Sequence, residues 1–394
     1  MANKLVHAAE RKAFELVLDT AGKKAVNNRE EGYVGVVNAI QKLLGDTWPP
    51  EAYDRLRATF SKEGKWTTFF NNLIDRVDLD YLKGLFMSFG FEAGFTGFQE
   101  TRKSAKKYGC GIPWVILFDP TSACNLHCTG CWASEYSRQL NLTYEQMDKM
   151  VTEAKELGIH GFVLTGGEPT VRKKDIFKLA QKHNDCGFML FTNGTLVDQE
   201  FCDEMKKSKN IVLSMSIEGK EEATDNRRGQ GVFQKVMDTM DLLRKNGLVY
   251  GVSICYTHQN YKAVTSDDFL DFLIDKGVAF AWYFHFMPVG MDATPELMPT
   301  PESVSTCTTE FVRSVAMRAA SRSSAWTSRT MVSSCRAASR AASTTATSTR
   351  TAMSSRAYSF TTQARTSRRR VFSSACSSRC SRHISRISRL TTIT

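Results

Sequence analysis

Apolar residues follow two different rhythms along this chain. Before residue 109 they recur at helical spacing, for example at Val34, Val37 and Ile40, which predicts an all-helical N-terminal region over residues 1–109. From Trp114 onwards, short apolar runs alternate with stretches of helical pattern. Six runs have the length expected of buried strands; they cover 114–118, 160–164, 187–191, 211–216, 250–255 and 279–286.

Helical patterns separate these predicted strands. Thr143 and Gln146 form a capping-box pattern at the start of one helix. The other helical patterns cover 173–183, 198–207, 232–246 and 267–276. Because strands that alternate with helices form parallel sheets, we expect an α/β fold, an open partial (β/α)6 barrel within residues 110–302. Functional groups are expected at the carboxyl ends of its strands.

The first predicted strand leads into a loop with three cysteines, Cys124, Cys128 and Cys131. Thiolates hold iron–sulfur clusters, and a [4Fe–4S] cluster normally takes four of them. A loop that offers three would leave one iron open to another ligand. Two other interpretations remain at this point: ordinary cysteines without a ligand role, or part of a structural zinc site that takes a further ligand from elsewhere.

The cysteine spacing, placed after a first strand, resembles the signature of the radical S-adenosylmethionine (SAM) enzymes. One departure is Gly130, because relatives often carry an aromatic residue before the last cysteine; here Trp132 follows the loop. The resemblance covers roughly residues 114–302. It implies that a [4Fe–4S] cluster on the three cysteines chelates SAM. One electron would then cleave SAM to methionine and a 5′-deoxyadenosyl radical, which abstracts hydrogen from the substrate.

The ends of the later strands carry further motifs. The second strand ends in Thr165-Gly-Gly-Glu-Pro169, which resembles the family element that holds the methionine amino group of SAM. Glycines allow close backbone approach, and a carboxylate suits an ammonium group. By resemblance, the residues expected to bind SAM are Gly166, Gly167, Glu168, Pro169, Thr192, Asn193, Ser216, Glu218, Pro288 and Val289. No catalytic acid or base is predicted.

Charge is distributed unevenly over the 394 residues, whose formal net charge is +11. Residues 303–394 contain 16 Arg, no Lys, no Asp and one Glu, so they carry +15 and the first 302 residues carry −4. A basic protein would suggest a nucleic-acid partner, but the predicted barrel is mildly acidic and we expect none. Without a signal peptide or a long apolar run, and without a disulfide framework among the cysteines, a cytoplasmic enzyme is expected.

Residues 303–394 lack Gly, Pro, Asn, Asp and Lys and show no strand or helix period. The codons of residues 347–357 can also be read in a shifted frame, if the third base of each codon is chosen freely among the synonymous options. They can then encode Ile-Asn-Ala-Asn-Gly-Asp-Val-Glu-Pro-Cys. This shifted-frame sequence resembles the auxiliary-cluster (SPASM-type) extension of many radical SAM enzymes. We therefore interpret the segment as the product of a frame disruption near Glu302, and expect a disordered tail in place of the sixth barrel helix and a second cluster domain.

The substrate is open at this stage. A peptide undergoing maturation is the first hypothesis, because the shifted-frame sequence resembles a SPASM-type extension. A lipid chain is the second, because residues 66–98 are rich in Phe and Leu; the same richness also fits helices that pack on the barrel. The expected partners are this substrate and a one-electron donor such as flavodoxin or ferredoxin. Other classes remain as alternatives: a zinc structural module, or a nucleic-acid-binding protein with a basic tail.

Overall fold

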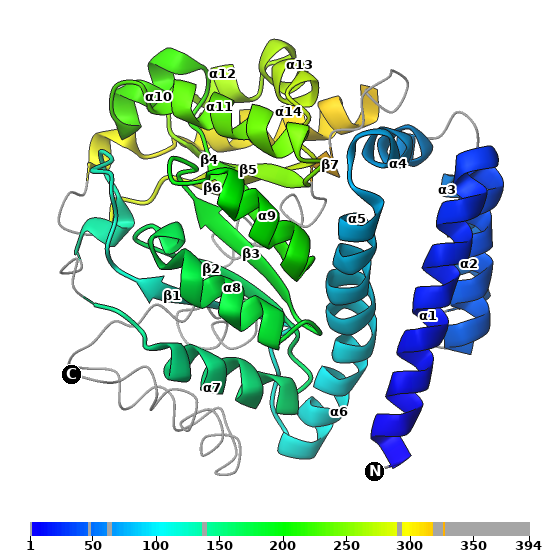
Figure 1. Cartoon of the computed structure of the whole chain (residues 1–394). Helices are drawn as coiled ribbons and strands as arrows, with labels where there is room; N and C mark the ends of the chain where they lie inside the picture. Colours follow the sequence, from blue (N-terminus) through cyan, green and yellow to red (C-terminus); the bar gives the residue numbers. More distant parts are fainter. Residues whose placement is uncertain are drawn as a thin grey trace, which may run out of the picture.

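A parallel sheet forms the centre of the molecule in the computed structural model (Figure 1). The structure describes residues 2–45, 49–60, 65–135, 140–289, 294–317 and 326–327. The strands follow one another in sequence order across the sheet, and all pairs are parallel. Their bounds are β1 Val115–Thr121, β2 Gly161–Gly166, β3 Gly187–Thr192, β4 Ile211–Ser216, β5 Tyr250–Tyr256, β6 Phe280–His285 and β7 Trp326–Thr327.

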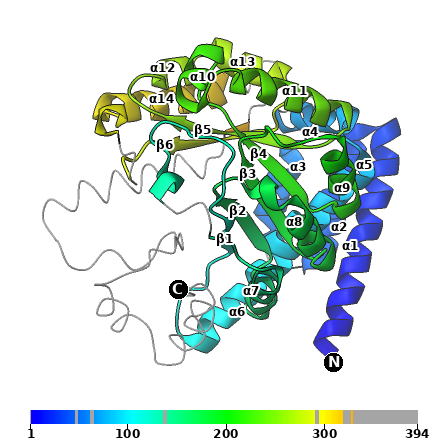
Figure 2. The same ribbon diagram turned by 60° about the vertical axis from the view of Figure 1, so that its left-hand side comes forward.

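Helices cover the outer face of this sheet, with α7–α9 over the first strands and α10–α14 over the later ones (Figure 2). The predicted α/β partial barrel is therefore confirmed. Two short helices after β4 and β5, α10 and α12, were not predicted from the apolar pattern. The outer helices are α7 Tyr144–Glu156, α8 Lys173–Lys182, α9 Gln199–Ser208, α10 Glu221–Arg228, α11 Val232–Lys245, α12 Tyr261–Val264, α13 Asp267–Asp275 and α14 Pro301–Met317.

Strand alternation determines which side chains form the core beneath these helices. Phe162 and Leu164 of β2 are fully buried, whereas Val163 and Thr165, which alternate with them, are partly exposed. Successive strand residues point to opposite faces, so one face packs on helices and the other faces the open barrel. At the helix level, the capping box of Thr143 and Gln146 forms as predicted and begins α7.

The N-terminal region is helical, as predicted. It contains a 12-residue π-helix, η2, whose wide turns no sequence period indicated. Glu92 of η2 is fully buried and forms ion pairs with His7 Nε2 at 2.9 Å and Arg11 Nε at 3.1 Å, which tie α1 to η2. The elements are α1 Ala2–Asn27, α2 Arg29–Leu44, α3 Pro50–Thr59, α4 Lys65–Arg76, α5 Leu79–Leu85, η2 Phe86–Gly97 and α6 Phe98–Tyr108.

The segment from α5 to α6 runs along the ends where the strands begin (Figure 1). Tyr81 Oη donates to the carbonyl of Ile211 at the start of β4, at 2.6 Å. Gly187 at the start of β3 lies so close to the Phe89 ring that a Cβ there would come within 2.7 Å of it. The N-terminal helices therefore close the amino end of the barrel and leave the carboxyl ends of the strands for a site.

The Phe-rich stretch belongs to this packing. Phe69, Leu82 and Leu85 join the barrel core, and Phe91 packs with Phe14 of α1 in a smaller core. Phe98 is the exposed aromatic residue of the stretch. Apart from Phe98 and the exposed Leu79, the apolar side chains described in this stretch are partly or fully buried, which supports the packing interpretation and removes the main argument for a lipid-facing surface.

Helix α14 crosses the boundary that we placed at residue 302. Ser303 is fully buried, and Cys307, with 2% of its surface exposed, joins the barrel core. The expectation of a disordered tail directly after residue 302 is therefore wrong for the first turns of α14. Tyr283 of β6 is also buried, and its hydroxyl donates to Val264 O at 2.9 Å.

The rest of the expected disordered tail, residues 318–325 and 328–394, lies outside the described residues. The two-residue strand β7 pairs with β6 through Phe280 and Trp326. Among the residues that the structure describes, no helix combines the length and apolar character needed to cross a lipid bilayer.

Candidate functional site

The cysteine loop lies at the carboxyl end of β1, on the side opposite the N-terminal helices (Figure 1). Leu126 N donates to Cys124 Sγ at 3.4 Å, and Cys131 N donates to Cys128 O at 3.2 Å. Gly130 has a φ of 63°, a left-handed conformation that favours glycine. The loop therefore presents its three partly buried thiols from a short, tightly turned segment.

The surroundings of these thiols have opposing effects on their ionisation. Burial raises the pKa of Cys124 and of Cys128 above that of an ordinary thiol. Arg228 works in the other direction at Cys128, where its Nη1 lies 3.9 Å from Sγ. Because metal ligation requires thiolates, a bound cation would overcome the effect of burial, as expected for a site that ionises only when it is filled.

Arg227 and Arg228 connect the cysteine loop to Glu218. Arg227 Nη1 donates to Glu218 Oε1 at 2.6 Å, and Arg228 Nε donates to the same oxygen at 2.9 Å. The Arg227 main chain is also bonded to the loop, since Thr129 N donates to Arg227 O at 2.8 Å. Glu218 is 1% exposed. We expected it to contact SAM; its carboxylate accepts hydrogen bonds from these two arginines and from Cys255 N.

The Gly166–Gly167 step packs directly against the chain that leads into the cysteine loop. A Cβ at Gly167 would overlap the carbonyls of Ser122 and Ala123, and a Cβ at Gly166 would overlap Thr121 O. Gly167 N donates to Thr121 O at 2.9 Å, and Glu168 N to Ala123 O at 2.7 Å. Glycine is therefore required at both positions; this Gly166–Gly167 step, named the glycine cradle, packs on residues 121–123 just before Cys124.

Glu168 follows Gly167, and its buried carboxylate accepts hydrogen bonds on both oxygens. Its Oε1 accepts from Thr170 N at 3.0 Å and Thr192 Oγ1 at 2.6 Å, and its Oε2 accepts from Asn193 N at 2.7 Å. Burial raises the pKa of Glu168, and these hydrogen bonds act against that rise. Three of the predicted residues, Glu168, Thr192 and Asn193, are thus brought together at the ends of β2 and β3.

A second link joins the cysteine loop to β3. Asn193 Nδ2 donates to Asn125 Oδ1 at 2.8 Å, and Asn125 Nδ2 donates to Thr195 Oγ1 at 2.8 Å. Asn125 was not among the predicted site residues. A signal was present, since it follows Cys124 directly, but only the tertiary structure shows its partner.

The other predicted residues lie around the same edge. Pro169 is buried at the start of a 3₁₀ turn after Glu168, and Ser216 ends β4 next to Ser253 of β5. Pro288 and Val289 follow β6 and are partly or fully exposed.

The end of β6 also reaches the cysteine loop through Phe286. A Cβ on Gly130 would come within 2.7 Å of the Phe286 ring, so Phe286 fills the space beside the position where relatives often carry an aromatic residue. The ring is buried, and the Arg227 guanidinium lies 5.7 Å from its centre.

Asp119 is a site residue that the sequence interpretation missed. It lies in β1 at the register irregularity between Phe118 and Thr121, and its Oδ1 is buried with no hydrogen-bond partner in the described part of the chain. Burial raises the pKa of Asp119 to about 6. A carboxylate inside an otherwise apolar strand, five residues before Cys124, was the available signal.

A zinc interpretation can be tested by ligand spacing. Around one zinc ion with Zn–S bonds near 2.3 Å, ligand sulfurs lie about 3.8 Å apart. Within the described ranges, the ligand set gathered within 4.8 Å is His160, Asp185 and Cys186, not the three loop cysteines. The Lys155 ammonium lies 2.6 Å from the Asp185 carboxylate, which therefore already has a positively charged partner. Neither place supports a mononuclear zinc site.

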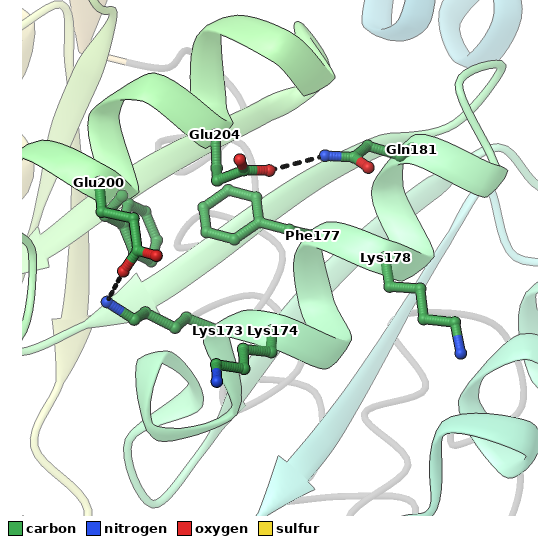
Figure 3. A pocket seen from close by; sticks show the side chains of 8 residues that line it. Lys173, Lys174, Phe177, Lys178, Gln181, Glu200 and Glu204 are labelled. Atoms are coloured by element: carbon green, nitrogen blue, oxygen red, sulfur yellow. Dashed lines mark hydrogen bonds and ion pairs between the residues drawn. The ribbon is translucent and has the colours of Figure 1, made fainter.

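A groove between α8 and α9 lies away from this site, on the outer helical layer (Figure 3). Phe177 and Phe201 form its floor, and its polar side chains are paired across the helices, Lys173 with Glu200 and Gln181 with Glu204. Figure 3 shows Lys178 directed away from it. Among the described residues, none that line this groove has a buried polar atom left without a hydrogen-bond partner, so nothing there indicates a ligand.

The fold and the site together define a class of protein. Residues 118–273 match the model of the Radical SAM superfamily, and this part of the chain is a radical SAM domain. Members of this superfamily are enzymes that use a [4Fe–4S] cluster and SAM. The residues present fit both groups: one short loop carries three thiols beside the glycine cradle, and the buried Oδ1 of Asp119 at that cradle has no hydrogen-bond partner among the described residues.

Among particular proteins, the chain is 28% identical over 194 residues to the AdoMet-dependent heme synthase of Methanosarcina barkeri, covering 48% of this chain and 55% of that protein. It is 26% identical over 221 residues to the PqqA peptide cyclase of Bradyrhizobium diazoefficiens, covering 53% and 56%. The chain thus matches about half the length of these curated relatives. The crystal structure of Streptococcus suis SuiB bound to precursor peptide SuiA has a TM-score of 0.48, at 18% identity, and the match covers 56% of this chain and 50% of that one.

Proposed function

We propose that this chain is a radical SAM enzyme whose cluster is held by Cys124, Cys128 and Cys131. The observation that carries the proposal is the junction of the three-cysteine loop with the Gly166–Gly167 cradle at the carboxyl end of the barrel. When bound, the cluster and SAM supply reductive cleavage of SAM and hydrogen abstraction from the substrate. The electron would come from a flavodoxin or ferredoxin.

The residues of the chain supply position and charge. The Arg227–Thr129 main-chain bond and the Asn125–Asn193 bond hold the two halves of the cysteine loop against β3 and α10. Arg228 places a positive charge beside Cys128, which favours the thiolate form. Glu168, Thr192 and Asn193 fix the backbone on which the methionine part of SAM would lie.

For the substrate we propose a peptide that is modified after synthesis. Support comes from the similarity to a peptide cyclase and from the SPASM-like sequence that the shifted reading frame encodes. The buried Phe-rich helices leave the lipid hypothesis without a structural argument. Because another relative is a heme synthase, a substrate screen has to include porphyrins.

Anaerobic reconstitution tests the cofactor assignment. The full chain is expected to bind one [4Fe–4S] cluster, seen by iron and sulfide analysis and by electron paramagnetic resonance after reduction. Cys128→Ala should abolish the cluster, since two thiols remain in the loop. Cys202→Ala, which removes a buried thiol of α9, is the matched control and should retain it. A complete cluster in Cys128→Ala would overturn the assignment.

A further inference from the structure

Asp119 lies against the first glycine of the cradle. Its Cβ and Cγ are 2.8 and 3.1 Å from the position that a Gly166 Cβ would occupy. The register irregularity of β1 falls between Phe118 and Thr121, and irregularities of this kind re-aim side chains next to active sites. The Asp119 carboxyl therefore stands at the edge of the cradle, on a rigid strand.

The Asp119 carboxylate is incompletely satisfied by the protein. Its Oδ1 has no hydrogen-bond partner in the ranges that the structure describes, and it is shielded from solvent. A buried carboxylate without a donor is unfavourable, and such groups in folded proteins call for a specific explanation. A ligand that brings a positively charged donor would complete this one.

Glu168, the other carboxylate of the cradle, is already committed. An ionised carboxylate has about four lone-pair positions, and Glu168 accepts from Thr170 N, Thr170 Oγ1, Thr192 Oγ1 and Asn193 N. Three of these donors share Oε1, so Glu168 is left with one acceptor position on Oε2, whereas Asp119 Oδ1 accepts from no donor in the described part of the chain.

We propose that Asp119 is a binding residue for the ammonium group of the methionine part of SAM. This inference rests on the proposed function, since it takes the Gly166–Gly167 cradle as the SAM site. Glu168 then acts mainly as a positioning residue, which holds the ends of β2 and β3 in place beneath the ligand.

Three ligands separate this role from a general effect on the site: SAM, S-adenosylhomocysteine, which keeps the ammonium group, and 5′-methylthioadenosine, which lacks it. Calorimetry on the full chain with its reconstituted cluster compares the wild type with Asp119→Asn. The variant should bind the first two about tenfold to a hundredfold more weakly, as expected for loss of a charge-assisted hydrogen bond. Its affinity for 5′-methylthioadenosine should be unchanged.

The control variant is Asp185→Asn, which removes a partly buried carboxylate at the amino end of the barrel. It should leave all three affinities unchanged. A second measurement needs no variant: wild-type affinity for SAM should fall below about pH 6, as Asp119 takes up a proton, while affinity for 5′-methylthioadenosine stays constant.

Equal weakening for all three ligands in Asp119→Asn, or no weakening for any, would overturn the inference. Absence of a cluster or of SAM binding in the wild type would instead count against the proposed function. The two failures are therefore distinguishable.

Discussion

At the scale of single residues, two acidic side chains of the barrel show opposite behaviour. Burial raises the pKa of Asp119, whose Oδ1 has no hydrogen-bond partner in the described part of the chain. Asp185 is also partly buried, but the hydrogen bond and charge of Lys155 outweigh burial and lower its pKa. One carboxylate is costly for the folded protein and the other is stabilising, which is the contrast expected between a ligand site and a structural ion pair.

The pH dependence of stability should reveal this contrast. The pKa of Asp119 rises from 3.8 to about 6 on folding, so its charged form opposes folding and stability is lost between about pH 4 and 6. Asp119→Asn should therefore be more stable than the ligand-free wild type at pH 7, by up to about 3 kcal/mol, with no gain below about pH 4. Urea unfolding across this range measures the difference.

Asp185→Asn provides a comparison of opposite sign. Its folded-state pKa is lowered, so its contribution is present above the unfolded-state pKa and is lost as pH falls. That variant should be less stable than the wild type at pH 7 and should approach it in acid. A stability gain for Asp119→Asn that does not vary with pH would contradict the assigned ionisation.

At the scale of elements, α10 and the N-terminal helices hold opposite ends of the barrel. The end of α10 presents Arg227 and Arg228 to the cysteine loop, with Glu218 as their shared partner. Tyr81 of α5 reaches the start of β4. Both contacts join segments that are far apart in the sequence, and neither follows from helical periodicity.

Arg228 is expected to tune the cluster. Donors and positive charge near a cluster sulfur favour the reduced state. Arg228→Gln should therefore retain the cluster and lower its reduction potential by on the order of 60 mV, a tenfold change for one electron. A potentiometric titration followed by electron paramagnetic resonance measures the shift. Arg244→Gln, which removes an exposed arginine of α11, should leave the potential unchanged; an equal shift in both variants would indicate a general charge effect.

The N-terminal helices are expected to unfold together with the barrel. Tyr81→Phe removes the hydrogen bond to Ile211 O without changing the volume of the ring, and should lower the unfolding free energy by about 1–2 kcal/mol. Urea denaturation followed by circular dichroism should show one transition at a lower midpoint. Thr59→Ala, which removes an exposed hydroxyl of α3, is the control. Two separate transitions would mean that the helices form an independent unit.

At the scale of the whole molecule, amino-acid composition changes abruptly near residue 302, whereas the structure continues across that position. Residues 303–394 have the composition of a segment that cannot build its own core. Helix α14 nevertheless begins in barrel sequence and continues to Met317, with Cys307 in the core. The structural boundary therefore lies beyond the compositional one.

Limited proteolysis can locate this boundary. Trypsin should leave a stable fragment that ends at Arg313 or Arg318, after the packed turns of α14, and that still binds the cluster. Mass spectrometry gives the end point. A fragment that ends near residue 302 would show that α14 does not stay docked, whereas resistance of the entire segment would contradict the interpretation of residues 303–394 as out-of-frame sequence. The DNA sequence across codon 302 should show a one-base insertion or deletion.

The sequence by itself determined the order of strands and helices, the position of the cysteine loop and the glycine cradle. These follow from local rules: apolar periodicity, capping and backbone conformations that only glycine adopts. It did not determine which side chains meet. Glu168 and Glu218 were both expected to contact SAM. In the structure Glu168 accepts four hydrogen bonds from neighbouring residues, and Glu218 accepts hydrogen bonds from two arginines. The buried Asp119 Oδ1, which has no hydrogen-bond partner among the described residues, becomes evident only when the strands are packed, because burial and hydrogen-bond satisfaction depend on residues distant in sequence.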